Sequence, residues 1–268
     1  MRARSLSGPK GFVVLAALCG AFIALPIFSL IARVPWSGIF TSLRSDVSTS
    51  AVKLSLRTSL TSTALAVVTG LPLAWVLAHR SFIGKRAIRA LCVLPMVLPP
   101  VVGGIALLYA FGTKGSVGSL LDHWFHIRIG FTETAAILSQ FFVAVPFFVV
   151  VMESAFLQFN EQFNGASRVL GSGPWRTMWH VTLPILRPSL LAGIVLTWAR
   201  ALGEFGATIT FAGNTPGRTQ TLPLAIYTSL ESGSNDALVL SLIMIAISFT
   251  TLVLLRDKWT SALQRSGS

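Results

Sequence analysis

The sequence predicts an all-α integral membrane protein with six transmembrane helices, and three observations lead to this fold class. Of its 268 residues, 53% are hydrophobic and only 11% are charged, with a mean hydropathy of +0.73, far more apolar than an average soluble domain. The apolar residues gather in runs long enough to cross a bilayer. Lys and Arg lie mainly between these runs, so the formal net charge of +12 indicates membrane topology rather than nucleic-acid binding.

The first predicted span is Gly11–Ile31, which follows a basic segment containing Arg2, Arg4 and Lys10. A cleaved signal peptide is the alternative, because it also combines a basic start with an apolar run. The 21 residues of this run exceed the usual apolar core of about 7–15 residues in a signal peptide. We therefore favour a retained helix with a cytoplasmic N-terminus.

Five further spans follow from the apolar runs. They are predicted at Ser59–Ala78, Leu91–Phe111, Thr134–Met152, Pro188–Phe211 and Ala237–Leu255. The second of these five contains Pro95, Pro99, Pro100, Gly103 and Gly104. Proline removes a helical hydrogen bond, so we expect this span to be kinked and packed inside the bundle, as a bent structural helix rather than a direct substrate site.

The distribution of basic residues orients the spans. With the N-terminus inside, the inner segments hold 13 Lys and Arg residues and the outer loops hold 7. The bias places both termini in the cytoplasm of a multi-pass cell-membrane protein. It is weakest in the first outer loop, which carries four basic residues. The predicted organisation is an N-terminal helix and first outer loop over residues 1–53, a transmembrane domain over 54–255 and a cytoplasmic tail over 256–268.

A water-soluble, helix-forming insert, Asn160–Pro184, separates the fourth and fifth spans and should face the cytoplasm. Phe163, Ala166 and Leu170 share one helical face, and Asn160 is placed to cap that helix. Gly171 to Pro174 should break the helix and open a second one, which groups Trp175, Met178, Trp179 and Thr182 and ends at Pro184. The alternative is an amphipathic loop on the bilayer surface.

The insert resembles the cytoplasmic signature of ABC importer permeases: Glu-Ala-Ala, three residues, Gly, nine residues, Ile, one residue, Leu-Pro. The matching residues here are Gly165, Ala166, Ser167, Gly171, Val181, Leu183 and Pro184. Gly165 stands where the family has Glu, Ser167 replaces the second Ala and Val181 replaces Ile. The resemblance implies the type I ABC importer permease fold, with a coupling helix between helices 4 and 5 that docks on an ATPase subunit. The absent Glu puts an ionic contact at that position in doubt.

The fifth span holds two ionisable residues, Arg200 and Glu204, one helical turn apart. Charges inside a bilayer are costly, and they usually face a bundle interior or an aqueous path. Either the two neutralise each other, with Gly203 and Gly206 allowing close helix approach, or they line a transport pathway. A paired arrangement argues against a permanent anion site at Arg200.

The run Ala199–Tyr227 looks like the corresponding region of molybdate ABC transporter permeases, to which sulfate permeases are related. The resemblance implies a permease that pairs with a second subunit as a homodimer, binds cytoplasmic ABC ATPase subunits and receives a tetrahedral oxyanion from an extracytoplasmic binding protein. Molybdate is the first choice, and tungstate or sulfate are alternatives. Arg200, Gly203, Glu204 and Thr208 are assigned to the pathway or its gate, and Asn214, Thr215 and Arg218 to contact with the binding protein; a solvated turn also explains these last three.

No motif in the sequence indicates an enzyme. The G-x-x-x-x-G-K-[ST] phosphate loop is absent, so ATP hydrolysis is expected on a separate chain. His123 and His126 lack the further ligands of a metal site, and no cofactor is expected. A secondary anion carrier and a membrane-embedded enzyme or assembly factor are the other classes considered. The first lacks apparent inverted repeats and the second lacks a catalytic constellation.

Overall fold

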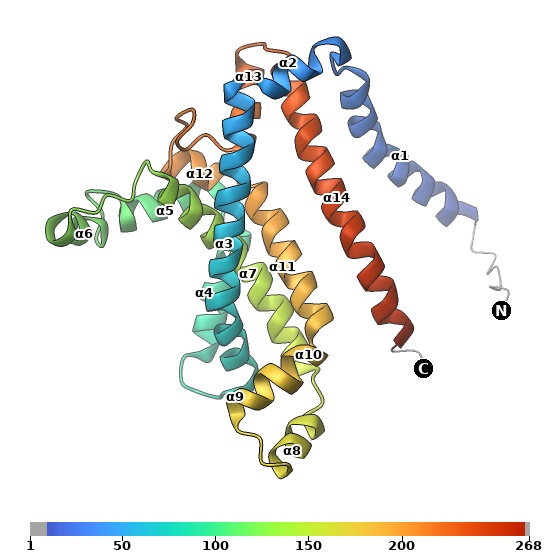
Figure 1. Ribbon diagram of the computed structural model, residues 1–268, viewed down its shortest axis with the longest axis vertical. Coiled ribbons are helices and arrows are strands. Elements are labelled where there is room, and N and C mark those ends of the chain that lie inside the picture. Colours follow the sequence, from blue (N-terminus) through green and yellow to red (C-terminus); the bar gives the residue numbers. More distant parts are fainter. Residues whose placement is uncertain (1–9, 266–268) are drawn as a thin grey trace.

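The computed structural model describes residues 10–265, and the secondary-structure elements in this range are all helices, which confirms the all-helical fold class. Three long helices pack against one another and form its centre (Figure 1): α3 (Asp46–His79), α7 (Glu133–Leu157) and α11 (Arg187–Leu202). The other elements are α1 (Lys10–Ala32), η1 (Trp36–Gly38), α2 (Ile39–Arg44), α4 (Lys85–Val97), α5 (Pro100–Phe111), α6 (Gly118–Phe125), α8 (Gln162–Val169), α9 (Pro174–Thr177), η2 (Met178–Thr182), α10 (Leu183–Ile185), α12 (Gly206–Phe211), α13 (Leu222–Glu231) and α14 (Asp236–Arg265).

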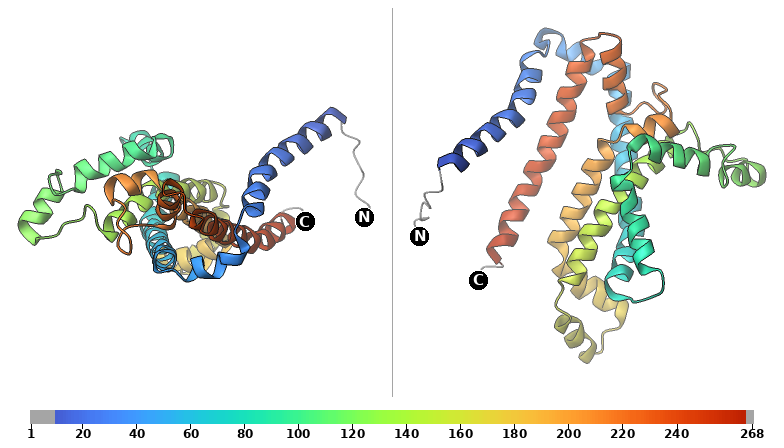
Figure 2. Two further views of the ribbon diagram at one scale, coloured as in Figure 1. Left: turned by 90° about the horizontal axis from the view of Figure 1, so that it is seen from above. Right: turned by 180° about the vertical axis from the view of Figure 1, so that it is seen from behind.

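The peripheral helices extend to opposite sides of this centre. Helix α1 stands apart on one side, beyond α14, which packs on α13 and α11, while α5 and α6 project to the other side (Figures 1 and 2). None of the apolar window of α1 is buried within the chain. Helix α14 continues to Arg265, so the predicted tail over 256–268 begins inside a helix, and its last three residues lie outside the described range.

Helix α3 begins well before the predicted start at Ser59. The Ser45 hydroxyl accepts a hydrogen bond from the backbone N–H of Ser48 at 3.2 Å, and Asp46 in the first turn suits the positive end of the helix dipole. Two basic residues assigned to the first outer loop, Lys53 and Arg57, therefore lie on α3. Arg57 pairs with Glu133 at the start of α7, with 3.0 Å between Nε and Oε1. One of the four basic residues assigned to the first outer loop, Arg57, thus has an acidic partner in the structure.

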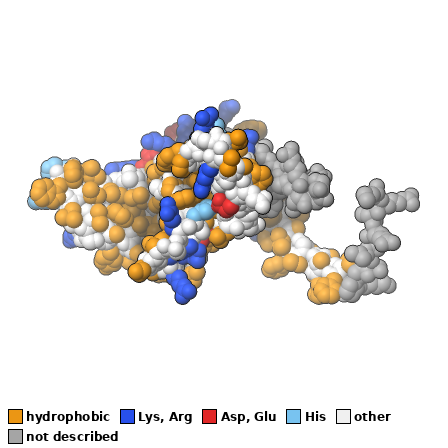
Figure 3. Space-filling view, turned by 90° about the horizontal axis from the view of Figure 1, so that it is seen from below, with side chains coloured by type: hydrophobic (Ala, Val, Ile, Leu, Met, Phe, Trp, Pro, Cys, Tyr) orange, Lys and Arg blue, Asp and Glu red, His pale blue; other side chains and the backbone are white. Residues whose placement is uncertain are grey.

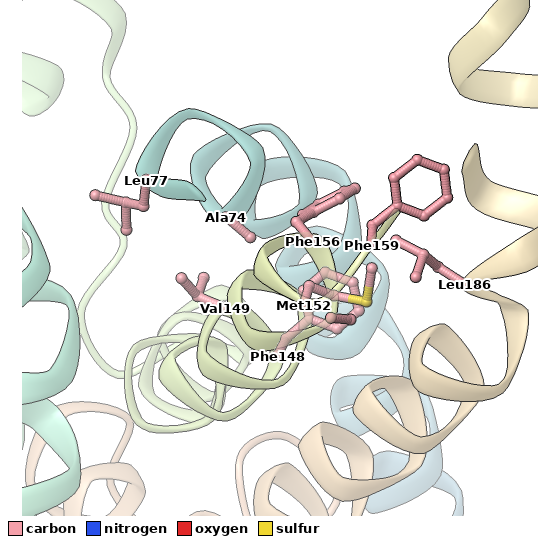
Figure 4. Packing of buried hydrophobic residues seen from close by; sticks show 9 residues of the cluster. Ala74, Leu77, Phe148, Val149, Met152, Phe156, Phe159 and Leu186 are labelled. Atoms are coloured by element: carbon pink, nitrogen blue, oxygen red, sulfur yellow. The ribbon is translucent and has the colours of Figure 1, made fainter. Parts of the chain in front are cut away.

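Helices α3 and α7 run in the same direction and pack closely because α3 presents small residues to α7. A Cβ atom at Gly70 would lie 2.9 Å from the Phe148 ring, so only glycine fits there. Beside this contact a buried apolar cluster fills the lower half of the bundle (Figure 4). Its members are Ala74, Leu77, Phe148, Val149, Met152, Ala155, Phe156, Phe159 and Leu186.

Two of the predicted spans are broken rather than continuous. The Leu91–Phe111 span, expected to be kinked, divides into α4 and α5 at Leu98, whose extended backbone is the conformation favoured before a proline. Pro99 then lacks the N–H that would continue the helix. The Pro188–Phe211 span divides into α11 and α12, with Gly203, Glu204 and Phe205 between them.

Glycines allow α5 and α12 to touch. A Cβ atom at Gly104 would lie 2.8 Å from the Ala207 carbonyl oxygen, and one at Gly206 would lie 2.7 Å from Pro100 Cβ. Both distances are too short for real atoms. At Gly203 the nearest atoms to an added Cβ are 3.6 and 3.9 Å away, so the close approach predicted for Gly203 and Gly206 occurs only at Gly206.

Helix length alone supports three spans within the described residues, namely α1, α3 and α7, or four when the bent pair Pro174–Ile185 and Arg187–Leu202 is counted as one. Helix α5 and the apolar part of α14, Asp236–Thr251, are shorter than a full span. The count of six therefore stays a prediction.

We expect Gly104→Ala and Gly206→Ala each to destabilise the protein by about 1–3 kcal/mol, because the added methyl group forces α5 and α12 apart. The measurement is thermal unfolding of the purified protein in detergent. Gly203→Ala is the matched control and should unfold at the wild-type temperature. Equal stability of all three variants would refute this packing.

Candidate functional site

The segment predicted to couple to a partner forms a helical hairpin at one end of the bundle (Figure 1). We call residues 161–186 the hairpin: its first arm is α8 and its second arm is α9, η2 and α10. The second arm meets α11 at a bend of 78°, with only Leu186 between them. The hairpin is thus joined directly to α11.

The first arm begins and ends near the predicted positions. The residue before α8 is Glu161 rather than Asn160, but the Asn160 Oδ1 atom still accepts a hydrogen bond from Gln162 N at 3.0 Å. After α8, Gly171 adopts the left-handed conformation with a φ of +81°, which a residue with a side chain adopts at a cost. Gly171 therefore forms the turn that connects the two arms.

The second arm starts at Pro174 as predicted, but it does not end at Pro184. Residues Met178–Thr182 form a π-helical turn, in which Leu183 N donates to Met178 O. Pro184 has no N–H to give to a carbonyl of the preceding turn, and the wider turn accommodates that loss. The helix therefore continues past Pro184 to Ile185.

The residues predicted for coupling divide into two groups. Gly165, Ala166, Gly171 and Pro184 are exposed. Ser167 and Leu183 are buried and Val181 is half-buried, so these three hold the hairpin together rather than forming its outer surface. The Ser167 hydroxyl lies 3.0 Å from the Thr177 hydroxyl and joins the two arms.

The tip of the hairpin carries large apolar side chains that none of the described residues covers. Val169 is 88% exposed, Leu170 85% and Trp175 76%. Seen from this end, the molecule presents Lys and Arg side chains among hydrophobic ones (Figure 3). Such a patch at the end of a bundle is typical of a protein interaction site.

Arg200 and Glu204 form an ion pair at the break between α11 and α12. The Nη1 and Oε2 atoms are 2.7 Å apart, and the Glu204 side chain is 1% exposed. The other carboxylate oxygen, Oε1, accepts a hydrogen bond from Ala207 N at 2.9 Å. Glu204 therefore balances the arginine and also caps the first turn of α12.

The other predicted pathway residues do not join this pair in one cluster. Gly203 is exposed beside it, whereas Thr208 is fully buried in α12 and its hydroxyl has no hydrogen-bond partner within the described residues. Ser139 of α7 donates to Ala207 O at 3.3 Å and holds α12 against the bundle.

Asn214, Thr215 and Arg218 lie in the loop between α12 and α13. Asn214 Nδ2 donates to the Thr228 hydroxyl at 2.8 Å, while Thr215 and Arg218 are exposed. Arg218 N donates to Thr215 O at 3.1 Å, which makes a β-turn. The turn presents Arg218 at the surface.

The histidine pair considered for a metal does not form a site. Asp122, the carboxylate nearest in sequence, pairs instead with Arg128, with 3.0 Å between Oδ1 and Nε. Among the described residues no group of three or more His, Cys, Asp or Glu could hold a metal ion.

Sequence reasoning missed two contacts, because their partners are far apart in the chain, and one buried polar residue. His79 at the end of α3 contacts Glu161 of the hairpin. Arg89 of α4 pairs with Glu153 of α7. Gln140 of α7 is fully buried, and neither atom of its amide group has a hydrogen-bond partner in the described part of the chain. Only Glu153 and Gln140, polar residues inside an apolar run, gave a sequence signal.

These features define a helical membrane subunit with an interaction surface at one end and a charged pair at a helix break. The family model for the inner membrane component of binding-protein-dependent transport systems matches residues 70–266. The chain therefore belongs to this family.

Relatives and a solved structure agree with that assignment. The chain is 42% identical over 238 residues to the molybdenum transport system permease protein ModB of Mycobacterium tuberculosis, covering 88% of this chain and 90% of the relative. It is 35% identical over 238 residues to a probable sulfate transport system permease protein of Marchantia polymorpha, covering 87% and 82%. A chain of a bacterial ABC transporter that imports alginate superposes with a TM-score of 0.67 at 17% identity, covering 95% and 96%. The fold is that of type I ABC importer permeases.

We expect Arg200→Ala to destabilise the protein more than Glu204→Ala, because it leaves a fully buried carboxylate unpaired, at a cost of about 3–5 kcal/mol. Glu204→Ala leaves an arginine that is 28% exposed and loses the cap on Ala207. The double variant should recover part of the loss. The measurement is a double-mutant cycle on thermal stability and yield of folded protein.

The pair of Arg57, which is 74% exposed, and Glu133, which is 27% exposed, provides the control. Arg57→Ala should cost at most about 1 kcal/mol, since a pair whose cation lies in solvent contributes little. Strictly additive losses at Arg200 and Glu204 would show that the two do not act as a pair.

Proposed function

We propose that this chain is the permease subunit of an ABC importer that translocates molybdate across the cell membrane. The support is its family membership together with 42% identity to a molybdenum transport permease over most of both chains. It carries out no bond chemistry of its own, and ATP is hydrolysed on a separate ATPase chain. It needs no cofactor and does not bind nucleic acid.

The observation that carries this proposal is the uncovered apolar tip of the hairpin. Leu170 and Trp175 are exposed to solvent in the isolated chain, and Gly171 fixes the turn that presents them. We assign this tip to the docking of a cytoplasmic ABC ATPase subunit, one on each of two permease copies in a homodimer. Gly165, Ala166 and Pro184 extend the same outer surface.

The pathway is assigned to the broken helix α11–α12. Its break holds the one buried ion pair that α11 contributes, so a change in the angle between α11 and α12 acts directly on Arg200 and Glu204. Because the arginine is neutralised, an oxyanion passing there is held weakly, which suits a cargo that must leave. Alternating access follows from ATP-driven movement of the hairpin.

The loop between α12 and α13 is assigned to the extracytoplasmic binding protein. Thr215 and the cationic side chain of Arg218 are exposed on a turn, and Asn214 anchors that turn to α13. This assignment places the loop outside and the hairpin inside, with both termini in the cytoplasm.

Sulfate is the second candidate cargo, because a probable sulfate permease matches over a similar length at 35% identity. Tungstate has the same tetrahedral shape and charge as molybdate. Selectivity among these ions then depends on the binding protein as well as on this chain.

The topology has a direct test. In a variant with Cys19 and Cys92 replaced by Ala, single cysteines at Ser116→Cys and Asn214→Cys should react with an impermeant thiol reagent added to intact cells. Ser172→Cys, in the hairpin, should react only after the membrane is opened. Labelling of Ser172→Cys from outside would overturn both the orientation and the docking assignment.

The function has a test in proteoliposomes that contain the permease, its ATPase and its binding protein. We expect ATP-dependent uptake of labelled molybdate that exceeds uptake of sulfate at equal concentration. Tungstate should compete with molybdate. Absence of ATP-dependent molybdate uptake would contradict the proposal. Equal uptake of sulfate would show that the complex does not prefer molybdate to sulfate.

A matched pair of surface variants connects uptake to the hairpin. Leu170→Glu places a charge in the proposed docking tip and should abolish uptake by releasing the ATPase. Leu230→Glu changes an equally apolar side chain, 69% exposed in α13, and should leave uptake unchanged.

A further inference from the structure

The hairpin contacts α3 through one polar pair of side chains. His79 Nε2 lies 3.1 Å from Glu161 Oε1, although the two residues are 82 positions apart. Among the side chains that the structure describes, those of residues 11–251 and 253, this is the one hydrogen bond that joins the hairpin to a helix remote in sequence. Helices α7 and α11 are joined to the hairpin by the chain itself, whereas α3 is not.

The His79 ring is held in a fixed orientation. Its Nδ1 atom lies 3.1 Å from the Trp75 carbonyl oxygen, and the ring stacks on Trp75 and meets the edge of Phe156. Both ring nitrogens thus lie within hydrogen-bond distance of an oxygen atom, one on α3 and one on the hairpin.

From Glu161 the contacts continue through both arms of the hairpin. Glu161 Oε2 accepts a hydrogen bond from Asn164 Nδ2 at 2.9 Å, and Asn164 Oδ1 accepts one from the Thr182 hydroxyl at 3.0 Å. Thr182 is buried in η2. The series His79, Glu161, Asn164 and Thr182 therefore links α3, the first arm and the second arm.

The same end of α3 is also fixed to its neighbours in the bundle. Arg89 of α4 donates from Nε to Glu153 of α7 at 3.0 Å, and from Nη2 to the Leu77 carbonyl oxygen at 3.5 Å. The buried cluster around Phe156 fills the space between α3 and α7 (Figure 4). A displacement of His79 therefore moves α3, α4 and α7 together.

We infer that the pair His79 and Glu161 is the tie by which α3 follows the hairpin during transport. The inference rests on the proposed function, in which an ATPase moves the hairpin. Without the tie the hairpin still moves α7 and α11, which it meets through the chain, but it moves α3 only indirectly, through the packing of α3 on α7, so the end of α3 at His79 follows the hairpin less closely. His79 and Glu161 are thus positioning residues that convert ATP hydrolysis into opening of the pathway.

The test is the number of ATP molecules hydrolysed per oxyanion imported by the reconstituted complex. Glu161→Ala and His79→Ala should each raise this ratio at least fivefold, and the double variant should raise it no further. Gln162→Ala, on the same turn of α8 but without contact to α3, is the matched control and should keep the wild-type ratio. His79→Gln, which keeps an amide donor near the position of Nε2, should restore coupling, whereas His79→Asn should not.

A cross-link provides a second measurement that does not depend on the stability of the alanine variants. In a variant with Cys19 and Cys92 replaced by Ala, His79→Cys and Glu161→Cys are joined by a short bifunctional thiol reagent. If the two helices move together, the joined complex imports within twofold of the wild type. Loss of uptake on cross-linking would show that the contact opens during the cycle and would overturn the inference.

The outcomes separate this inference from the proposed function. The ratio is measured with whichever of molybdate, tungstate or sulfate the wild-type complex imports. Lack of molybdate uptake by the wild type counts against the proposed function. An unchanged ratio in both alanine variants, with the ATPase still bound, counts against the tie alone.

Discussion

The close packing of α3 on α7 is the constraint on which the rest of the structure depends. In an apolar medium helices gain little from the hydrophobic effect between themselves, so they associate where small residues permit close van der Waals contact. Gly70 against Phe148 provides such a contact, and the buried hydroxyls of Ser55 and Ser59 bind Leu222 N and the Trp198 ring nitrogen. These contacts attach α13 and α11 to α3. Phe159, just before the hairpin, and Leu186, at its end, belong to the buried cluster that α3 and α7 share.

The sequence predicted the helical class and the hairpin because both depend on local composition and on special backbone positions. Gly171 and Pro174 were found because a left-handed turn and a helix start each favour one residue type. Ion-pair partners one turn apart, such as Arg200 and Glu204, could also be predicted. The contact of His79 with Glu161 could not, since only the folded bundle brings them together.

The errors have local physical causes. The start of α3 was placed too late because its first turns are rich in Ser and Thr, whose low hydropathy hides a helix that buries several of them against other helices. The hairpin was ended at Pro184 because a regular α-helix cannot accept proline there, whereas a π-helical turn can. The carboxylate that the family signature places at position 165 is absent, but Glu161 stands one turn earlier on the same arm, where its exposed side chain contacts His79 of α3.

Because the hairpin joins α11 at the bend at Leu186, a small rotation at the bend displaces the far end of α11 by a larger distance. A helix of 16 residues is about 24 Å long, so a rotation of about 5° at the bend shifts its other end by about 2 Å. A shift of about 2 Å is comparable to the distance between the hydrogen and the acceptor oxygen in a hydrogen bond. Glu204 lies just beyond this end and also caps α12. In the proposed mechanism, a small rotation of the second arm is therefore enough to change the position of α12 against the bundle. In the proposed mechanism, the displacement produced at the bend is therefore largest at the end of α11 where Arg200 and Glu204 form their ion pair.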